Sequence, residues 1–285
     1  MQPKSILSKF MVTLAASSDV GSSIAIQVSH DPSLEFPQAD KVVEGTNWAR
    51  DIGSVESYDF VVVDLPFGLK RKNIHIGDSS ISVRGNWAEL AKALYLVEKN
   101  GLCIAIVEPP AFGISEGPKF LEALENEGFY LKGVFNVPPN LLSTTSVRPV
   151  LAVFSRETQS SLFVGELEEE AQATVLAEAF NGGAASDSLH EGMLLEKWKF
   201  DGFESLKARL QLKRLETQYK DFKTEVLGEL AVEMNVVRSG NILEHKDNSI
   251  YIPILGSSAV TEDLSAVTIK PVSYTHLTLP TIYSV

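Results

Sequence analysis

One short turn groups residue types that could do chemistry on a planar ring: Asp64-Leu65-Pro66-Phe67. It directly follows the run 59–63, whose β-branched residues are typical of a strand buried on both faces of a parallel sheet. The carboxylate of Asp64 and the backbone carbonyl of Leu65 can accept hydrogen bonds. Pro66 restricts φ, and the ring of Phe67 offers a face on which a base could stack. A catalytic role predicts an open cleft at Asp64 and a free face on Phe67. A structural role, in which Asp64 caps a turn, predicts that both side chains are buried.

The turn resembles the (Asp/Asn/Ser)-Pro-Pro-(Tyr/Phe) motif that amino-methyltransferases carry after a buried strand. An exocyclic adenine amine is a poor nucleophile because its lone pair is delocalised into the ring. The resemblance implies that Asp64 and the carbonyl of Leu65 accept hydrogen bonds from the two amine protons. The lone pair would then turn toward the sulfonium methyl group of S-adenosylmethionine, and Phe67 would stack on the flipped base. Leu65 stands where the family usually has its first proline, which would loosen the turn.

Strands and helices alternate after residue 58. The pattern predicts strands at 59–63, 101–107, 129–137 and 149–155, and helices at 87–98 and 119–126. Asn86 is the expected N-cap of the first helix, and Pro118 and Gly128 are expected to open and close the second. Such alternation is typical of βαβ units in a doubly wound sheet. Because no helix separates the last two strands, we expect them to pair antiparallel.

The segment 101–157 resembles the corresponding part of type I modification subunits of restriction-modification systems. It reads GLCIAIVEPPAF, then a helical pattern, then FNVPPNLLSTTSVRPVLAVFSRE. The resemblance covers 41–156 and continues more loosely to residue 270. It implies an α/β fold with a Rossmann-like class I methyltransferase sheet, partial here, and a C-terminal helical extension. It also implies an adenine-N6 DNA methyltransferase that uses S-adenosylmethionine, acts on DNA and assembles with specificity and restriction subunits.

Compared with that family, the chain looks truncated at both ends. We expect an incomplete methyltransferase core at 1–160 and an extension region at 161–270. The extension is expected to contain an acidic helix at 168–180, a long helix at 203–233 and a strand at 249–255. Residues 272–285, VSYTHLTLPTIYSV, resemble a translated sequencing-adapter read-through and are set aside from the fold.

The cofactor site has the weakest sequence signal. Methyltransferases hold S-adenosylmethionine with a glycine-rich turn after the first strand. The candidate here is Asp19-Val20-Gly21-Ser22-Ser23, a lone glycine that also fits an ordinary loop. Asn47 occupies the place where the family often contacts the cofactor's adenine, although a polar loop residue is the simpler interpretation. We therefore expect this chain to bind S-adenosylmethionine weakly or not at all, either because the first strands lie upstream of Met1 or because the site has decayed.

The net charge of −12 argues against a surface that embraces nucleic acid on all sides, because neutralising phosphates needs Lys and Arg. A basic cleft or a partner subunit could still supply the contact. One basic stretch lies on the expected long helix: Lys207, Arg209, Lys213 and Arg214. This stretch fits three interpretations: a solvated face, a DNA contact, or a contact with a specificity subunit.

The remaining features favour a cytoplasmic protein without a membrane span or a metal. No run of about eighteen apolar residues appears. The single Cys103 lies in an apolar run and is typical of a small buried hydrophobe in a reducing compartment. Four scattered histidines lack partners at metal-ligand spacing: His30, His75, His190 and His245.

Two other functions remain open at the level of sequence. An RNA or ribosomal amine methyltransferase could carry the same target motif. A degenerate methyltransferase fold could instead serve as a DNA-binding or scaffold module without activity. A second, similar stretch, Glu108-Pro109-Pro110-Ala111-Phe112, follows the next strand, and there a structural loop is the favoured interpretation.

Overall fold

The structure, a computed structural model, describes residues 3–16, 21–28, 39–52, 57–109, 112–113, 116–139, 142 and 147–220. The chain divides into two compact units, Met1–Leu215 and Glu216–Val285. The first unit holds the sheet and its helices. The predicted strand at 249–255, the last part of the predicted long helix and the tail at 272–285 lie outside the described residues.

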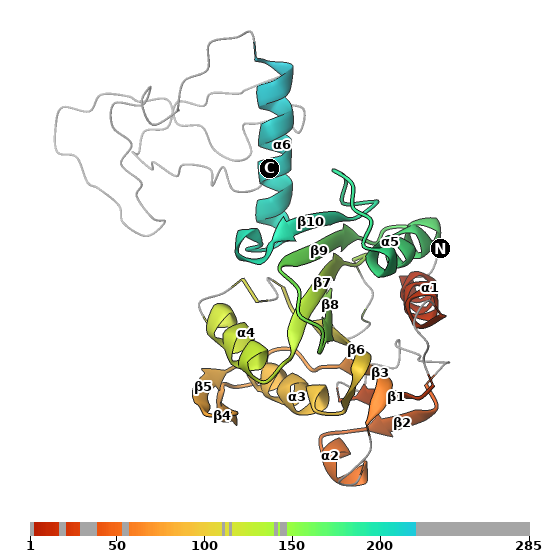
Figure 1. The fold of residues 1–285 in the computed structure, drawn as a ribbon, viewed down its shortest axis with the longest axis vertical. Helices are drawn as coiled ribbons and strands as arrows, with labels where there is room; N and C mark the ends of the chain where they lie inside the picture. Colours follow the sequence, from red (N-terminus) through yellow and green to blue (C-terminus); the bar gives the residue numbers. More distant parts are fainter. Residues whose placement is uncertain are drawn as a thin grey trace, which may run out of the picture. The chain divides into compact units, whose positions relative to one another are not determined.

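The first unit is built on one sheet of eight strands in the order β10-β9-β7-β8-β6-β3-β1-β2 (Figure 1). The strands are β1 Ser23–Gln27, β2 Lys41–Glu44, β3 Tyr58–Asp64, β6 Val97–Val107, β7 Tyr130–Asn136, β8 Val150–Ser155, β9 Ser161–Glu166 and β10 Met193–Glu196. β8 runs antiparallel to both of its neighbours, β10 runs antiparallel to β9, and the other strand pairs are parallel. Six strands therefore end at the same edge of the sheet.

This arrangement confirms the predicted α/β, Rossmann-like fold. The predicted parallel pair is found, with Val61 of β3 opposite Cys103 of β6. The predicted antiparallel pair is also found, with Phe135 of β7 opposite Leu151 of β8. The sequence patterns did not predict β1 and β2, which precede β3 in the chain. The expected domain boundary at residue 160 falls between β8 and β9, so the sheet extends past it.

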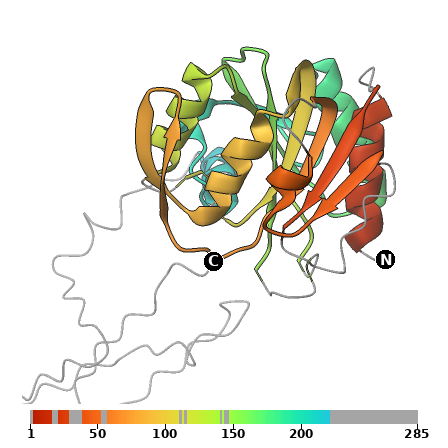
Figure 2. The ribbon, with the colours of Figure 1, turned by 90° about the horizontal axis from the view of Figure 1, so that it is seen from below.

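Helices cover both faces of the sheet (Figures 1 and 2). α1 Pro3–Ala16 and α5 Glu170–Gly182 pack side by side on one face, and α3 Gly85–Leu94 and α4 Gly117–Asn126 lie on the other. Val61 and Val63 of β3 point into the α3 side of the core, whereas Val62 points into the α1 side. β3 is therefore buried on both faces, as its β-branched run predicts.

Local capping residues are partly as predicted. Pro118 lies in the first turn of α4, and Gly128 follows its end with φ 80°. The prediction for Asn86 was wrong: α3 begins at Gly85, so Asn86 lies inside the helix and is fully buried. Its side-chain oxygen accepts a hydrogen bond from the N–H of Trp87 at 3.0 Å. The apolar residues of α3 that pack on the sheet start at Trp87. The helix itself begins earlier, so its first turn already includes Asn86.

The remaining elements are short or lie after the sheet. α2 Trp48–Asp51 follows β2, and a separate hairpin, β4 Lys72–Ile76 and β5 Ser79–Val83, follows β3. α6 Phe203–Gln218 follows β10 and a short 3-10 turn, Lys197–Lys199. No helix in the described part of the chain is both long enough and apolar enough to cross a bilayer.

Candidate active site

Asp64 is the last residue of β3 and lies at the edge where the parallel strands end. It is level with Gln27 at the end of β1 and with Ile106 near the end of β6. Its backbone carbonyl accepts a hydrogen bond from the N–H of Val28 at 3.0 Å. Ligands of open α/β sheets bind beyond the carboxyl ends of the strands, so this is the edge at which a substrate would bind. The side chain, however, is fully buried, whereas a catalytic role predicted that it faces an open cleft.

The turn after Asp64 crosses the sheet edge from one core to the other. Leu65 is buried in the core on the α3 side, whereas Phe67 is half-buried and packs against the core on the α1 side. Leu65, which replaces the proline of the related motif, therefore anchors the turn by burying its side chain. Gly68 follows with φ 72°, in the left-handed region that favours glycine.

Glu108, which comes directly after β6, holds this turn in place. Its Oε2 accepts a hydrogen bond from the backbone N–H of Gly68 at 3.3 Å, and its Oε1 pairs with Arg84. Arg84 also lies 3.9 Å from Glu116, which pairs with Arg71 at 3.3 Å. These contacts fit the interpretation that the sequence favoured for the stretch starting at Glu108, which is a structural loop without a catalytic role. The sequence offered one signal for this role, an acidic residue at the end of the strand next to β3.

Asn47 also lies at the carboxyl edge. It follows β2 in a turn where Gly45 has φ 83° and donates its N–H to the carbonyl of Gln27 at 2.9 Å. The Asn47 side chain is exposed and makes no capping hydrogen bond to α2. β1 lies between β2 and β3, so the strand before Asn47 and the strand that ends with Asp64 are about 10 Å apart across the sheet.

The suggested cofactor turn around Gly21 is at the opposite edge of the sheet. Gly21 and Ser22 precede β1, and their N–H groups donate to the carboxylate of Asp59 at 3.0 and 2.9 Å. Asp59 lies at the start of β3, five residues before Asp64. The structure therefore agrees with the interpretation of this glycine as an ordinary loop, because a cofactor turn must follow the first strand. The sequence that does follow β1, residues 28–39, contains no glycine.

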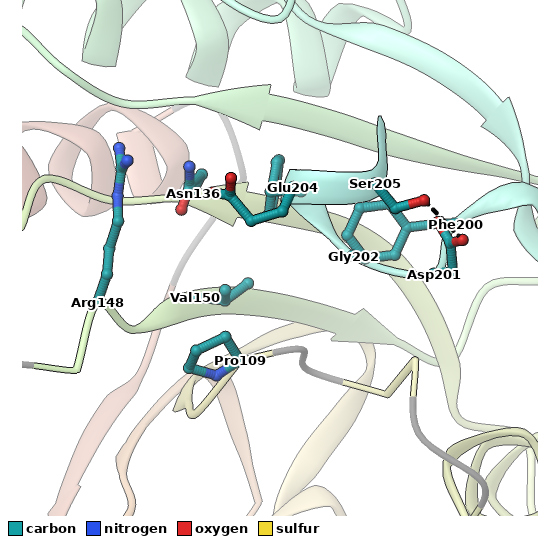
Figure 3. A pocket seen from close by; sticks show the side chains of 10 residues that line it. Pro109, Asn136, Arg148, Val150, Phe200, Asp201, Gly202, Glu204 and Ser205 are labelled. Carbon is teal, nitrogen blue, oxygen red and sulfur yellow. Dashed lines mark hydrogen bonds between the residues drawn. The ribbon is translucent and has the colours of Figure 1, made fainter. Parts of the chain in front are cut away.

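A pocket of about 340 Å³ lies farther along the same edge (Figure 3). It is lined by Pro109 after β6, Asn136 at the end of β7, Arg148 and Val150 at the start of β8, and residues 200–205 at the start of α6. Pro109 is next to Glu108, which binds the turn after Asp64. Through Pro109, the pocket is therefore lined by the same loop that supplies Glu108 to the turn. Sequence reasoning did not find it, because its walls come from segments far apart in the chain.

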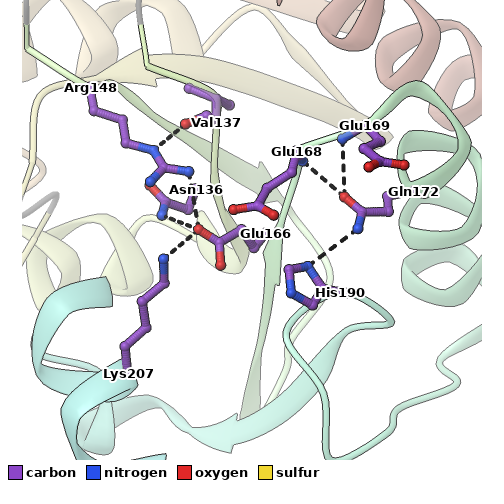
Figure 4. Close-up of polar contacts among 9 residues, drawn as sticks. All are labelled: Asn136, Val137, Arg148, Glu166, Glu168, Glu169, Gln172, His190 and Lys207. Carbon is purple, nitrogen blue, oxygen red and sulfur yellow. Dashed lines mark hydrogen bonds and ion pairs between the residues drawn. The ribbon is translucent and has the colours of Figure 1, made fainter. Parts of the chain in front are cut away.

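A buried carboxylate joins α6 to this edge of the sheet (Figure 4). Oε1 of Glu166, at the end of β9, accepts hydrogen bonds from Asn136 at 2.8 Å, Arg148 at 3.0 Å and Lys207 at 2.5 Å. Only 4 % of the Glu166 side chain is exposed. Arg148 also donates to the carbonyl of Val137. Lys207 therefore anchors α6 to the sheet. Across the described part of the chain, no group of His, Cys, Asp or Glu side chains is arranged to hold a metal ion.

The fold is similar to that of solved methyltransferases. Over 74% of this chain and 57% of the other, it matches the methyltransferase subunit of a type I restriction-modification system from Streptococcus thermophilus, with a TM-score of 0.52 and 13% identity. The M protein of the type I restriction enzyme EcoKI matches 70% of this chain and 56% of its own, with a TM-score of 0.44 and 9% identity. No protein-family profile and no curated protein sequence matches the chain. The first similarity confirms the fold that the sequence resemblance implied.

Proposed function

We propose that the chain transfers a methyl group from S-adenosylmethionine to the N6 amine of adenine in DNA, within a restriction-modification system. The observation that carries the proposal is the position of the turn: Asp64-Leu65-Pro66-Phe67 follows a central parallel strand at the carboxyl edge. The similarity in fold to a type I methyltransferase subunit supports it. The chain spans 57% of the length of that subunit. DNA is the proposed substrate, and specificity and restriction subunits are the proposed partners.

In this mechanism the two acceptors of the turn orient the amine. The carboxylate of Asp64 and the carbonyl of Leu65 each accept a hydrogen bond from one amine proton. Hydrogen bonds are stronger in a site of low dielectric, so the burial of Asp64 favours this role once the base is bound. Binding of the base requires the groups that cover Asp64 to move. Phe67 is half-buried, and in this mechanism the base would stack on the part of the side chain that the core does not cover.

The described residues fit one end of S-adenosylmethionine. When bound, the cofactor supplies the methyl group. Asn47 has an exposed amide at the carboxyl edge and would hydrogen-bond to the cofactor's adenine. The segment that follows β1 has no glycine to let the backbone approach the ligand closely. We therefore expect weak binding, so activity is to be measured at saturating cofactor.

A matched pair of variants tests the proposal. Asp64→Asn keeps an acceptor oxygen in a side chain of the same shape, whereas Asp64→Ala removes it. We expect Asp64→Ala to abolish the transfer of tritium-labelled methyl groups to duplex DNA, and Asp64→Asn to retain part of the activity. Phe67→Ala should weaken base binding by roughly 1–3 kcal/mol. Asp187→Ala, at an exposed carboxylate near the end of β9 and four strands away from β3, is the control and should keep full activity.

Two results would overturn the proposal. If the folded protein leaves DNA unlabelled at saturating cofactor, the proposed activity is refuted. If Asp64→Ala keeps full activity, the assignment of this site is refuted. Labelling of RNA in preference to duplex DNA would favour an RNA methyltransferase. Thermal melting of each variant shows whether a loss of activity is a loss of folding.

Two observations favour a second candidate, a non-catalytic methyltransferase fold that serves as a DNA-binding or scaffold module. Asp64 is fully buried, and residues 28–39 have no glycine. This candidate predicts no heat of S-adenosylmethionine binding in calorimetry. It also predicts that Asp64→Ala lowers stability and has no separate effect on methyl transfer.

A further inference from the structure

The β4–β5 hairpin has two chemically different faces. Its strands pair antiparallel, with Ile74 opposite Ile81 and Lys72 opposite Val83. Ile76 and Val83 are buried, and Ile74 and Ile81 pack against the same core as α3 and α4. Because side chains alternate along a strand, these residues define the inner face of the hairpin.

The outer face of the hairpin is a continuous row of hydrogen-bonding side chains. Asn73 lies opposite Ser82, and His75 lies opposite Ser80. All four residues are exposed. Hydroxyl and amide groups of this kind are common partners of the phosphate and sugar groups of nucleic acids.

Positive charge is concentrated where the chain enters this hairpin. Lys70, Arg71 and Lys72 are consecutive and exposed. The segment 69–84 contains four basic residues and one acidic residue, although the whole chain has a net charge of −12. Three of these cations pair with glutamates outside the segment: Arg71 with Glu116, Lys72 with Glu89 and Arg84 with Glu108. The exposed Lys70 and the exposed part of Arg71 therefore carry the charge that attracts a polyanion to this place.

The basic run also borders a groove of about 360 Å³. The groove is lined by Arg71, by residues 80–83 of β5, and by Glu116 and Lys119. Arg71 is fixed there, because it pairs with Glu116 at 3.3 Å and donates to the carbonyl of Ser82 at 3.1 Å. Its side chain still has 56 % of its surface exposed. Lys119, on α4, is exposed and adds a second cation to the groove.

The hairpin is held close to the candidate turn. Lys70 is only two residues after Gly68, which is bound by Glu108. The segment also passes tightly over the start of α3: a Cβ added to Gly85 would lie 2.8 Å from the carbonyl oxygen of Lys70. A polymer bound along the hairpin would therefore lie beside the turn that carries Asp64.

We propose that the outer face of the β4–β5 hairpin, together with Lys70, Arg71 and Lys119, binds the sugar-phosphate backbone of DNA. The cations neutralise phosphates and release counterions, and the Asn, His and Ser side chains hydrogen-bond to phosphate oxygens. The choice of DNA as the polymer rests on the proposed function. The surface itself is argued from charge, exposure and side-chain chemistry.

Two sets of variants test this surface with fluorescein-labelled duplex DNA, by anisotropy over a range of salt concentrations. In Lys70→Gln/Lys119→Gln, the slope of log K against log salt should become shallower by about 2, and Kd should rise on the order of tenfold. In Ser80→Ala/Ser82→Ala, binding should weaken while the slope stays unchanged. The control is Lys99→Gln/Lys132→Gln, which removes two lysines near the opposite, amino ends of β6 and β7 and should change neither quantity.

The outcomes separate this proposal from the proposed function. If both hairpin variants bind like the control, or if the unaltered chain shows no salt-dependent binding, the surface is not a DNA contact. Methyl transfer by the unaltered chain would still stand in that case. If the hairpin variants lose binding while the unaltered chain shows no methyl transfer, the surface is supported and the activity is not. Tighter binding of single-stranded RNA than of duplex DNA would overturn the choice of polymer.

Discussion

Glu166→Ala tests whether the buried carboxylate holds α6 on the sheet. The substitution removes the acceptor shared by Asn136, Arg148 and Lys207. Asn136 is 3 % exposed, so its amide would lose its partner in a buried site, at a cost of about 1–3 kcal/mol. The Arg148 and Lys207 side chains are 29% and 34% exposed, so water can solvate both cations, and each lost pair costs about 0–1 kcal/mol. Together these losses predict a decrease of about 1–5 kcal/mol in the free energy of unfolding.

Urea unfolding followed by circular dichroism measures this change. Glu166→Gln keeps an oxygen that can accept from Asn136, so its loss should be smaller, about 1–2 kcal/mol. The control is Glu157→Ala. Glu157 pairs with Lys132 at 2.9 Å, but its side chain is 64% exposed, so the loss should stay below about 1 kcal/mol. A Glu166→Ala protein as stable as the Glu157→Ala protein would refute the argument that burial makes this cluster a structural anchor.

Two further substitutions test the packing near the candidate turn and the start of the sheet. Gly85→Ala should lower stability by about 1–3 kcal/mol in urea unfolding, because its Cβ would collide with Leu69 and Lys70; Gly182→Ala, which meets nothing within 4 Å, should not. Asp40→Asn should destabilise the protein at neutral pH, because hydrogen bonds from the hydroxyl and the backbone N–H of Ser23 lower the pKa of the Asp40 carboxyl below its ordinary value. Because its pKa is lowered in the folded protein, the Asp40 carboxylate stabilises the fold above the pKa of the unfolded chain. The difference in the free energy of unfolding between Asp40→Asn and the unaltered chain should therefore shrink as acid protonates Asp40. A difference that is independent of pH would contradict this.

Local patterns in the sequence were sufficient for the central strands and their helices. The run 59–63 has β-branched residues on both faces, and β3 is covered on both faces. Pro118 and Gly128 have backbone preferences that act over one turn, and they bound α4 as predicted. The antiparallel pairing of β7 and β8 followed from the length of their connection, which needs no tertiary information.

Contacts between distant segments decided the rest. In the sequence, Gly21 fitted either a cofactor turn or an ordinary loop, and the strand after it places the glycine at the amino edge, bound to Asp59. Nothing near Asp64 in sequence indicated that its side chain would be fully buried, or that Glu108 would hold the turn. Glu166 begins the acidic run 166–170 in the sequence, and only its position at the end of β9 brings Asn136, Arg148 and Lys207 to it. Backbone preferences and hydrophobic periodicity act within a few residues and fix the elements. Burial and partners depend on the register and order of the strands, which only the folded chain specifies.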